Sequence, residues 1–444
     1  MRHRPLLVPL ALLAASLLAV ACSDKPGSDA TSTPPVPAAA TVQSTPAAAS
    51  PSASSAAAPG AGSFDIHKAL AHINMLAGAI GPRVAGSAGE RQAVQYISDQ
   101  LKSDGYSVEV RDFDFEGDPF RPAVLSFGDT KLQVLAMSGS SGGTVKGPGV
   151  FVGLGDSAGI ASQDLTGKVA VADRGIIRYS EKMDNVAKAG AIGLVIINNE
   201  AGELLGNLTK NGVLPVVGLA QSEGPQARAA ATSGAAITIQ APAAGATHSQ
   251  NVLARSAPGD RCVVLVGGHH DTVPGAPGAH DNASGAAETL ELARAFAADG
   301  LDKGLCFATF GAEESGLNGS KALVKELEAK GELPKFMVNL DTTGLGTKVD
   351  LIGAPELQRE AATLAQSMGI DAEASQLGAN FGSDHQSFAT SGVSVLFFAS
   401  NDVGKFHTAG DVASEIQPDF YDKGGELAYA FIKQLLRQVA PAGG

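Results

Sequence analysis

Residues Val263–Ser284, VVLVGGHHDTVPGAPGAHDNAS, decide the fold and the chemistry of this chain. An apolar, β-branched run ends in two glycines, and His269 and Asp271 follow directly. After a loop rich in glycine and proline, Asp281 stands at the start of a helical pattern. The order of strand, loop and helix N-terminus is typical of open α/β sheets, which bind ligands at the carboxyl ends of their strands. We therefore expect a ligand site at this edge of a sheet.

Two later apolar runs end in acids in the same manner. Glu313 and Glu314 follow the strand pattern 305–310, and Asp341 follows the pattern 336–340. Because parallel strands end at one edge of a sheet, we expect these acids to lie beside the first stretch.

Strands and helices alternate through the C-terminal part of the chain, which predicts an α/β fold. The expected sheet is mostly parallel but mixed, and helices cover both of its faces. The expected strands are Cys262–Gly268, Leu305–Phe310, Phe336–Leu340, Val349–Ile352 and Val393–Phe398, and the expected helices are Ala283–Ala298, Ser320–Lys330, Pro355–Met368 and Asp419–Gln438.

The 444 residues exceed one typical domain, and the composition changes along the chain. Short strands and many glycines from about residue 118 indicate a compact β-rich unit, after which α/β texture returns. We predict a signal peptide at 1–21, an Ala/Pro/Ser-rich linker without a core at 22–63, a first part of the α/β domain at 64–117, the inserted β-rich unit at 118–245, and the remainder of the α/β domain at 246–444.

The N-terminus reads as an export signal. Arg2 and Arg4 precede an apolar segment, residues 6–21, that is short for a membrane-spanning helix. The segment ends at Cys22 and resembles a bacterial lipobox, in which this cysteine carries lipid, although Ala19 stands where leucine is usual and leaves ordinary signal cleavage open. We expect a periplasmic or cell-surface protein, anchored to a bacterial membrane (the outer one where present).

The net charge of −13 argues against a surface for nucleic acid or anionic lipid. We therefore expect no nucleic-acid partner, and contact with a membrane only through lipid on Cys22. Export implies an oxidising compartment. Cys262 and Cys306 each lie seven residues before a site residue, so level parallel strands would place them side by side. They form either a disulfide or two buried free thiols.

Imidazole and carboxylate groups are ligands that zinc prefers. His269 ends a strand, and the side chain of Asp271 can return beneath the ring to accept its second N–H. Asp281 can project into the same crevice and bridge two metals, although an aspartate before a helix is often only an N-cap.

Two adjacent glutamates at a strand end cannot both point one way. We interpret Glu314 as a metal ligand and Glu313 as a general base; the alternative is a solvated acidic turn. With Asp341 and a late histidine, His407, the set becomes a two-zinc peptidase site.

These motifs together resemble a zinc aminopeptidase of the M28 peptidase family with an inserted protease-associated (PA) domain. The motifs appear in the family's order: His269-His270-Asp271, Asp281-Asn282-Ala283-Ser284-Gly285, Gly311-Ala312-Glu313-Glu314, Asn339-Leu340-Asp341, Ser383-Asp384-His385 and His407-Thr408, with Gly167-Lys168-Val169-Ala170 and Leu214-Pro215-Val216-Val217 in the PA region.

The resemblance implies a fold of the zinc aminopeptidase type and two Zn²⁺ ions. One ion would be held by His269 and Asp341, the other by His407 and Glu314, with Asp281 between them. It also implies a cis peptide bond after Asp281.

We expect hydrolysis of the N-terminal peptide bond of peptides with a free N-terminus. Asp384 and His385, in a polar loop, are expected to bind substrate. The alternatives are a carboxypeptidase or dipeptidase of the same fold, a glutaminyl cyclase, and a non-enzymatic receptor-like module. The last two fit poorly, since a cyclase lacks the first histidine and a receptor module would have lost ligands. One departure stands out: Phe406 precedes His407 where the family often has a tyrosine that donates to the oxyanion.

Overall fold

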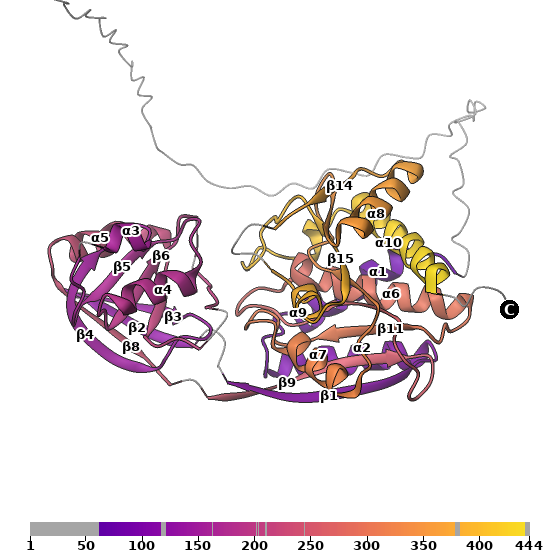
Figure 1. Cartoon of the computed structure of the whole chain (residues 1–444), viewed down its shortest axis with the longest axis horizontal. Helices are drawn as coiled ribbons and strands as arrows, with labels where there is room; N and C mark the ends of the chain where they lie inside the picture. Colours follow the sequence, from indigo (N-terminus) through magenta and orange to yellow (C-terminus); the bar gives the residue numbers. More distant parts are fainter. Residues whose placement is uncertain are drawn as a thin grey trace, which may run out of the picture. The chain divides into compact units, whose positions relative to one another are not determined.

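The computed structural model describes two sheets, drawn in Figure 1. The described residues are 62–116, 121–161, 163–200, 202, 204–208, 211–243, 245–377 and 382–439. The predicted signal peptide, Cys22 and nearly all of the predicted linker lie outside them. Within the described part of the chain, no helix is both long enough and apolar enough to cross a membrane.

The larger sheet has eight strands in the order β1-β9-β11-β10-β12-β15-β13-β14. The four central strands β11, β10, β12 and β15 run parallel, while β1, β9 and β13 include antiparallel pairings, so the predicted mostly parallel mixed sheet is confirmed. The strands are β1 Ser107–Glu116, β9 Ala246–Arg255, β10 Val264–His269, β11 Leu305–Phe310, β12 Phe336–Leu340, β13 Val349–Gly353, β14 Ala372–Ser375 and β15 Ser394–Ser400.

Every residue of β10, β11 and β12 is buried, because helices cover both faces of the sheet. Side chains alternate along β10: Val264 and Val266 join the core beneath α1, α2, α6, α8 and α10, whereas Leu265 joins the core beneath α7 and α9. The helical segments are α1 Ile66–Ile73, η1 Asn74–Ile80, α2 Ala88–Ser103, η3 Ala279–Ala283, α6 Ser284–Asp299, α7 Asn318–Lys330, α8 Pro355–Met368, α9 His385–Thr390, η4 Ala413–Glu415 and α10 Pro418–Val439.

The second sheet is a closed barrel in the order β2-β3-β7-β6-β5-β4-β8. Its interior is filled by aliphatic side chains such as Leu125, Val171 and Ile239. The chain leaves the larger sheet at Glu116 and returns at Ala246, two residues that pair across β1 and β9, so the barrel is an insertion. Its elements are β2 Pro122–Phe127, β3 Thr130–Ala136, β4 Gly143–Phe151, α3 Ser157–Ile160, β5 Val169–Asp173, α4 Tyr179–Lys188, β6 Gly193–Ile197, β7 Val216–Leu219, η2 Gln221–Glu223, α5 Gly224–Thr232 and β8 Ala236–Ala241.

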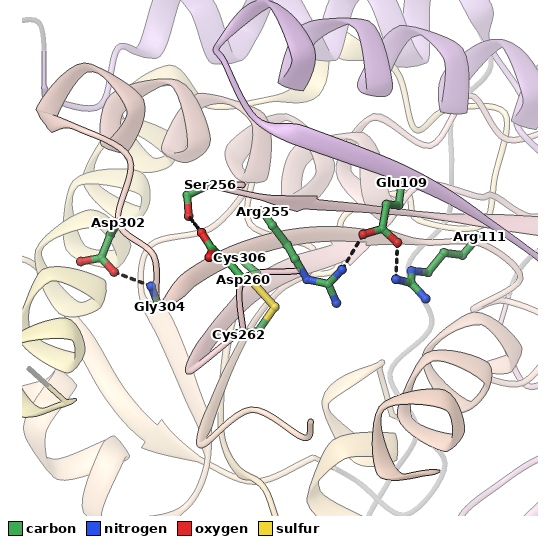
Figure 2. Close-up of a disulfide and its surroundings, with 9 residues drawn as sticks. All are labelled: Glu109, Arg111, Arg255, Ser256, Asp260, Cys262, Asp302, Gly304 and Cys306. Atoms are coloured by element: carbon green, nitrogen blue, oxygen red, sulfur yellow. Dashed lines mark hydrogen bonds and ion pairs between the residues drawn. A yellow bond between two sulfur atoms is a disulfide. The ribbon is translucent and has the colours of Figure 1, made fainter. Parts of the chain in front are cut away.

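A disulfide joins Cys262 to Cys306, with an S–S distance of 2.12 Å and a Cα–Cα distance of 5.4 Å (Figure 2). The level register from which we predicted the pair was wrong, since Cys306 lies opposite Leu265 in the parallel ladder. Cys262 precedes β10, in a segment where the N–H groups of Val263 and Val264 both donate to the carbonyl of Gly304. This irregular start of the strand, and not the ladder itself, brings the two sulfurs together.

Candidate metal centre

The expected ligands come from five segments that end at one edge of the larger sheet. His269 is the last residue of β10, and Glu314 and Asp341 follow β11 and β12. Asp281 lies in η3 immediately before α6, and His407 lies in the loop that follows β15. The parallel register brings these segments together although they span much of the chain's second half.

The donor atoms form two groups that share Asp281. In one group, His269 Nε2 lies 3.2 Å from Asp281 Oδ1 and 3.5 Å from Asp341 Oδ2. In the other, His407 Nε2 lies 3.0 Å from both Asp281 Oδ2 and Glu314 Oε2. The atoms of each group all lie within 4.8 Å of one another, and the groups match the expected pairing of acids with histidines.

These donors fit zinc in kind and in spacing. Ligands about 2.0–2.1 Å from a tetrahedral zinc lie roughly 3.3 Å from each other, and the separations in both groups are close to that value. Glu314 Oε1 and Asp341 Oδ1 are buried and have no hydrogen-bond partner, as expected of oxygens near a cation.

The backbone leaves the carboxylate of Asp281 free for this role. The Asp281–Asn282 peptide bond is cis, as the family resemblance implied. Asn282, not Asp281, accepts the N–H of Gly285 at the start of α6, at 2.8 Å. The reading of Asp281 as an N-cap is therefore wrong.

Asp271 does more than the sequence suggested. His269 Nδ1 lies 3.1 Å from the main-chain oxygen of Asp271 and 3.5 Å from its Oδ1. The two carboxylate oxygens accept the backbone N–H groups of Glu313 and Glu314, at 3.0 and 3.3 Å. Asp271 thus supports the imidazole and, equally, the turn that carries both glutamates.

That turn directs the side chains of Glu313 and Glu314 to different positions. Ala312 adopts a left-handed φ of 53°, which breaks the alternation at the end of β11. The side chains of Glu313 and Glu314 are only 10% and 6% exposed, so the alternative of a solvated acidic turn is wrong. Glu314 joins the second donor group, whereas Glu313 belongs to neither group and lies 4.0 Å from His269 Nε2.

Burial dominates the electrostatics of the acids. It raises the pKa of Glu314 to about 7, and it raises the pKa of Glu313 well above its usual value, with the charges of Glu314, Asp384 and Asp341 adding to the effect. Burial alone would lower the pKa values of His269 and His407, but the surrounding carboxylates raise both well above the usual value. So many buried carboxylates require compensating positive charge, which two divalent cations would supply.

The donor groups open into a cavity that is otherwise partly apolar. Its walls in the larger domain include Val324, Ile352, Leu377, Phe397 and Val403, and Glu313 also faces it. Asp384 and His385 do not line this cavity. Asp384 is fully buried and His385 stacks on Phe397 with ring centroids 4.8 Å apart. Asp384 precedes α9 and His385 begins it, and both side chains pack inward. That these two residues bind substrate stays a prediction.

Sequence reasoning missed the part played by Arg83. Its guanidinium is fully buried and donates to the main-chain oxygens of His270, Pro277 and Gly278. It therefore fixes both ends of the loop between His269 and Asp281. A fully buried arginine has no signature of its own in a single sequence.

Comparisons with known proteins agree with this geometry. The model of "Peptidase family M28" matches residues 251–432, and that of the "PA domain" matches residues 137–227. Aminopeptidase YwaD of Bacillus subtilis is 31% identical over 401 residues, which cover 84% of this chain and 86% of YwaD. The "Probable lipoprotein aminopeptidase LpqL" of Mycobacterium tuberculosis is 30% identical over 261 residues, 56% of this chain and 52% of LpqL. Among solved structures, BSAP, a zinc aminopeptidase from Bacillus subtilis, superposes with a TM-score of 0.71 at 28% identity, covering 84% of this chain and 95% of BSAP.

Proposed function

The chain belongs to peptidase family M28 and carries a PA domain, and from this premise we propose that it is a two-zinc aminopeptidase. The proposal rests on the position of the Asp281 carboxylate, which presents one oxygen to His269 and the other to His407. A carboxylate shared in this way suits two cations a few ångström apart.

Each ion would have its own histidine and its own acid. His269 and Asp341 would hold one zinc, His407 and Glu314 the other, and Asp281 would bind both. When bound, zinc would lower the pKa of a water molecule and polarise the scissile carbonyl.

Glu313 is the general base of the proposed reaction. It faces the cavity but stands outside both donor groups, so its carboxylate stays available for proton transfer. Glu313 takes a proton from the attacking water and then delivers it to the leaving amine.

The acids also explain why a free N-terminus would be selected. A substrate ammonium group placed near Glu313 and Asp341 would gain charge-assisted hydrogen bonds that an N-blocked peptide would lack. The apolar wall would then receive the first side chain of the peptide.

Cleavage of aminoacyl-nitroanilides, compared with their N-acetylated counterparts, tests the proposal. We expect hydrolysis of the free substrates alone, loss of that activity with a zinc chelator, and recovery when zinc is restored. Equal cleavage of blocked substrates, or release of C-terminal residues from N-blocked peptides, would contradict an aminopeptidase and favour the carboxypeptidase alternative.

We also propose export with lipid on Cys22, which lies outside the described residues. The similar protein LpqL is named a probable lipoprotein aminopeptidase, which supports this proposal. Incorporation of labelled fatty acid into the wild type but not into Cys22→Ala tests it; label in neither protein would favour ordinary signal cleavage.

A further inference from the structure

A second aspartate near the centre, Asp411, repeats the arrangement seen at Asp271. Its Oδ1 accepts the backbone N–H of His280 at 2.7 Å, and its Oδ2 accepts that of Asp281 at 3.1 Å. Its main-chain oxygen accepts the N–H of Ala279 at 3.2 Å. One buried residue therefore holds three consecutive N–H groups of the segment that ends in the shared ligand, while belonging to neither donor group itself.

We propose that Asp411 is a positioning residue that fixes the carboxylate of Asp281 between the two donor groups. The proposal rests on the proposed two-metal function. Asp411 follows His407 in the same loop, so it ties the segment that carries one ligand to the segment that carries another.

The segment around Asp281 needs an external support. Gly278 has a left-handed φ of 62°, and Asp281 and Asn282 have φ values of −118° and −134° inside what is otherwise a helical turn. With this irregular backbone, the N–H groups of residues 279–281 have Asp411 as their acceptor instead of a helical carbonyl. Buried N–H groups without an acceptor are costly, so loss of Asp411 should let the turn move.

A carboxylate suits this position better than an amide does. It has two acceptor oxygens, one for each N–H, and its charge strengthens both hydrogen bonds. Asparagine would keep one acceptor and would turn an NH₂ group toward the second N–H. Asp411→Asn should therefore weaken the support while keeping the volume of the side chain.

We expect the loss of Asp411 to lower zinc affinity at both metal sites. Because Asp281 presents one oxygen to His269 and the other to His407, a displaced Asp281 weakens both sites together. Groups that orient metal ligands typically change metal affinity about 10–100-fold when mutated.

The experiment compares the full chain with Asp411→Asn, Asp411→Ala and a matched control, Asp302→Asn. Asp302 also accepts a backbone N–H, from Gly304 at 2.7 Å, but it lies in an exposed loop close to the disulfide (Figure 2). Amide hydrogen exchange is measured on the metal-free proteins, and zinc affinity is measured by competition with a chromophoric chelator. Circular dichroism verifies that each variant retains the fold. If Asp411→Ala does not fold, the milder Asp411→Asn variant decides the test.

We expect faster exchange at residues 279–283 in both Asp411 variants, and zinc binding that is about 10–100-fold weaker at both sites, with the control unchanged. Wild-type exchange at this segment, or weakening of one site alone, would overturn the proposal. If the wild type binds only one zinc, the proposed two-metal function is overturned instead. Amide hydrogen exchange in the metal-free variants tests whether Asp411 holds residues 279–281, and this readout does not depend on metal.

Discussion

The two ends of β10 and β11 are built for opposite purposes. At their carboxyl ends lie His269 and the Glu313–Glu314 turn, with buried acids whose pKa values are raised by burial. Toward their amino ends lies the Cys262–Cys306 disulfide (Figure 2). Both cysteines belong to an apolar core cluster.

One pair of strands thus carries a cluster of buried acids at one end and a stabilising disulfide at the other. Buried acids oppose folding unless they are compensated, whereas a covalent link restricts the unfolded chain. We expect changes at the carboxyl ends to alter catalysis and changes at the amino ends to alter stability.

Glu313→Gln should produce the largest effect. Without the base, we expect kcat to fall by about 10³-fold, equivalent to roughly 4 kcal/mol, because the carboxylate that faces the cavity beside the donor groups can no longer take the proton. Steady-state kinetics measures the fall, and metal analysis should still find two zincs. Loss of zinc would mean that base and ligand are exchanged between Glu313 and Glu314. The exposed cavity residue Glu328, changed to Gln, serves as the control.

Replacing both Cys262 and Cys306 by serine should lower stability and spare activity. The disulfide closes a loop with a sequence separation of 44 residues, for which the chain-entropy model gives about 3–4 kcal/mol. Denaturant unfolding of wild type, reduced wild type and the double variant measures the difference. A large fall in kcat in the folded double variant would contradict the expectation that the amino ends of these strands affect stability and not catalysis.

Glu288, in α6, should make stability depend on pH. Burial raises the pKa of this fully enclosed carboxyl to about 8. Because its pKa in the unfolded chain is lower, near 4.5, the stabilising contribution is complete below that value and is lost as pH rises through about 8.

Glu288→Gln should remove this dependence, and the variant should gain on the order of 5 kcal/mol over the wild type at pH 8.5. The difference between the two unfolding free energies, measured from pH 5 to pH 9, isolates this residue from the other acids. A constant difference across that range would contradict the expectation.

Phe406→Tyr should have the smallest effect, and it should be a gain. The ring of Phe406 lines the cavity and lies beside His407, with centroids 4.3 Å apart, but it has no hydrogen-bond donor. A phenol O–H aimed at the developing oxyanion should raise kcat by up to about tenfold, or roughly 1 kcal/mol. A fall in kcat with unchanged zinc affinity would show that the hydroxyl does not reach the reacting carbonyl.

The sequence by itself determined the fold class and the members of the donor set. Apolar runs that close on His269, Glu314 and Asp341 are readable because strand length, period and flanking residues are local properties. The family resemblance added the pairing of acids with histidines and the cis peptide bond, which the geometry matches.

Features that depend on contacts between residues remote in sequence were decided only by the tertiary structure. The split of the Asp281 carboxylate, the hydrogen bonds of Asp411 to residues 280 and 281, and the inward packing of Asp384 are of this kind. So is the true register at Cys262, which an irregular strand start sets. Sequence patterns predict which residues reach the edge of the sheet, but burial and hydrogen-bond partners follow from packing between segments that the sequence does not place side by side.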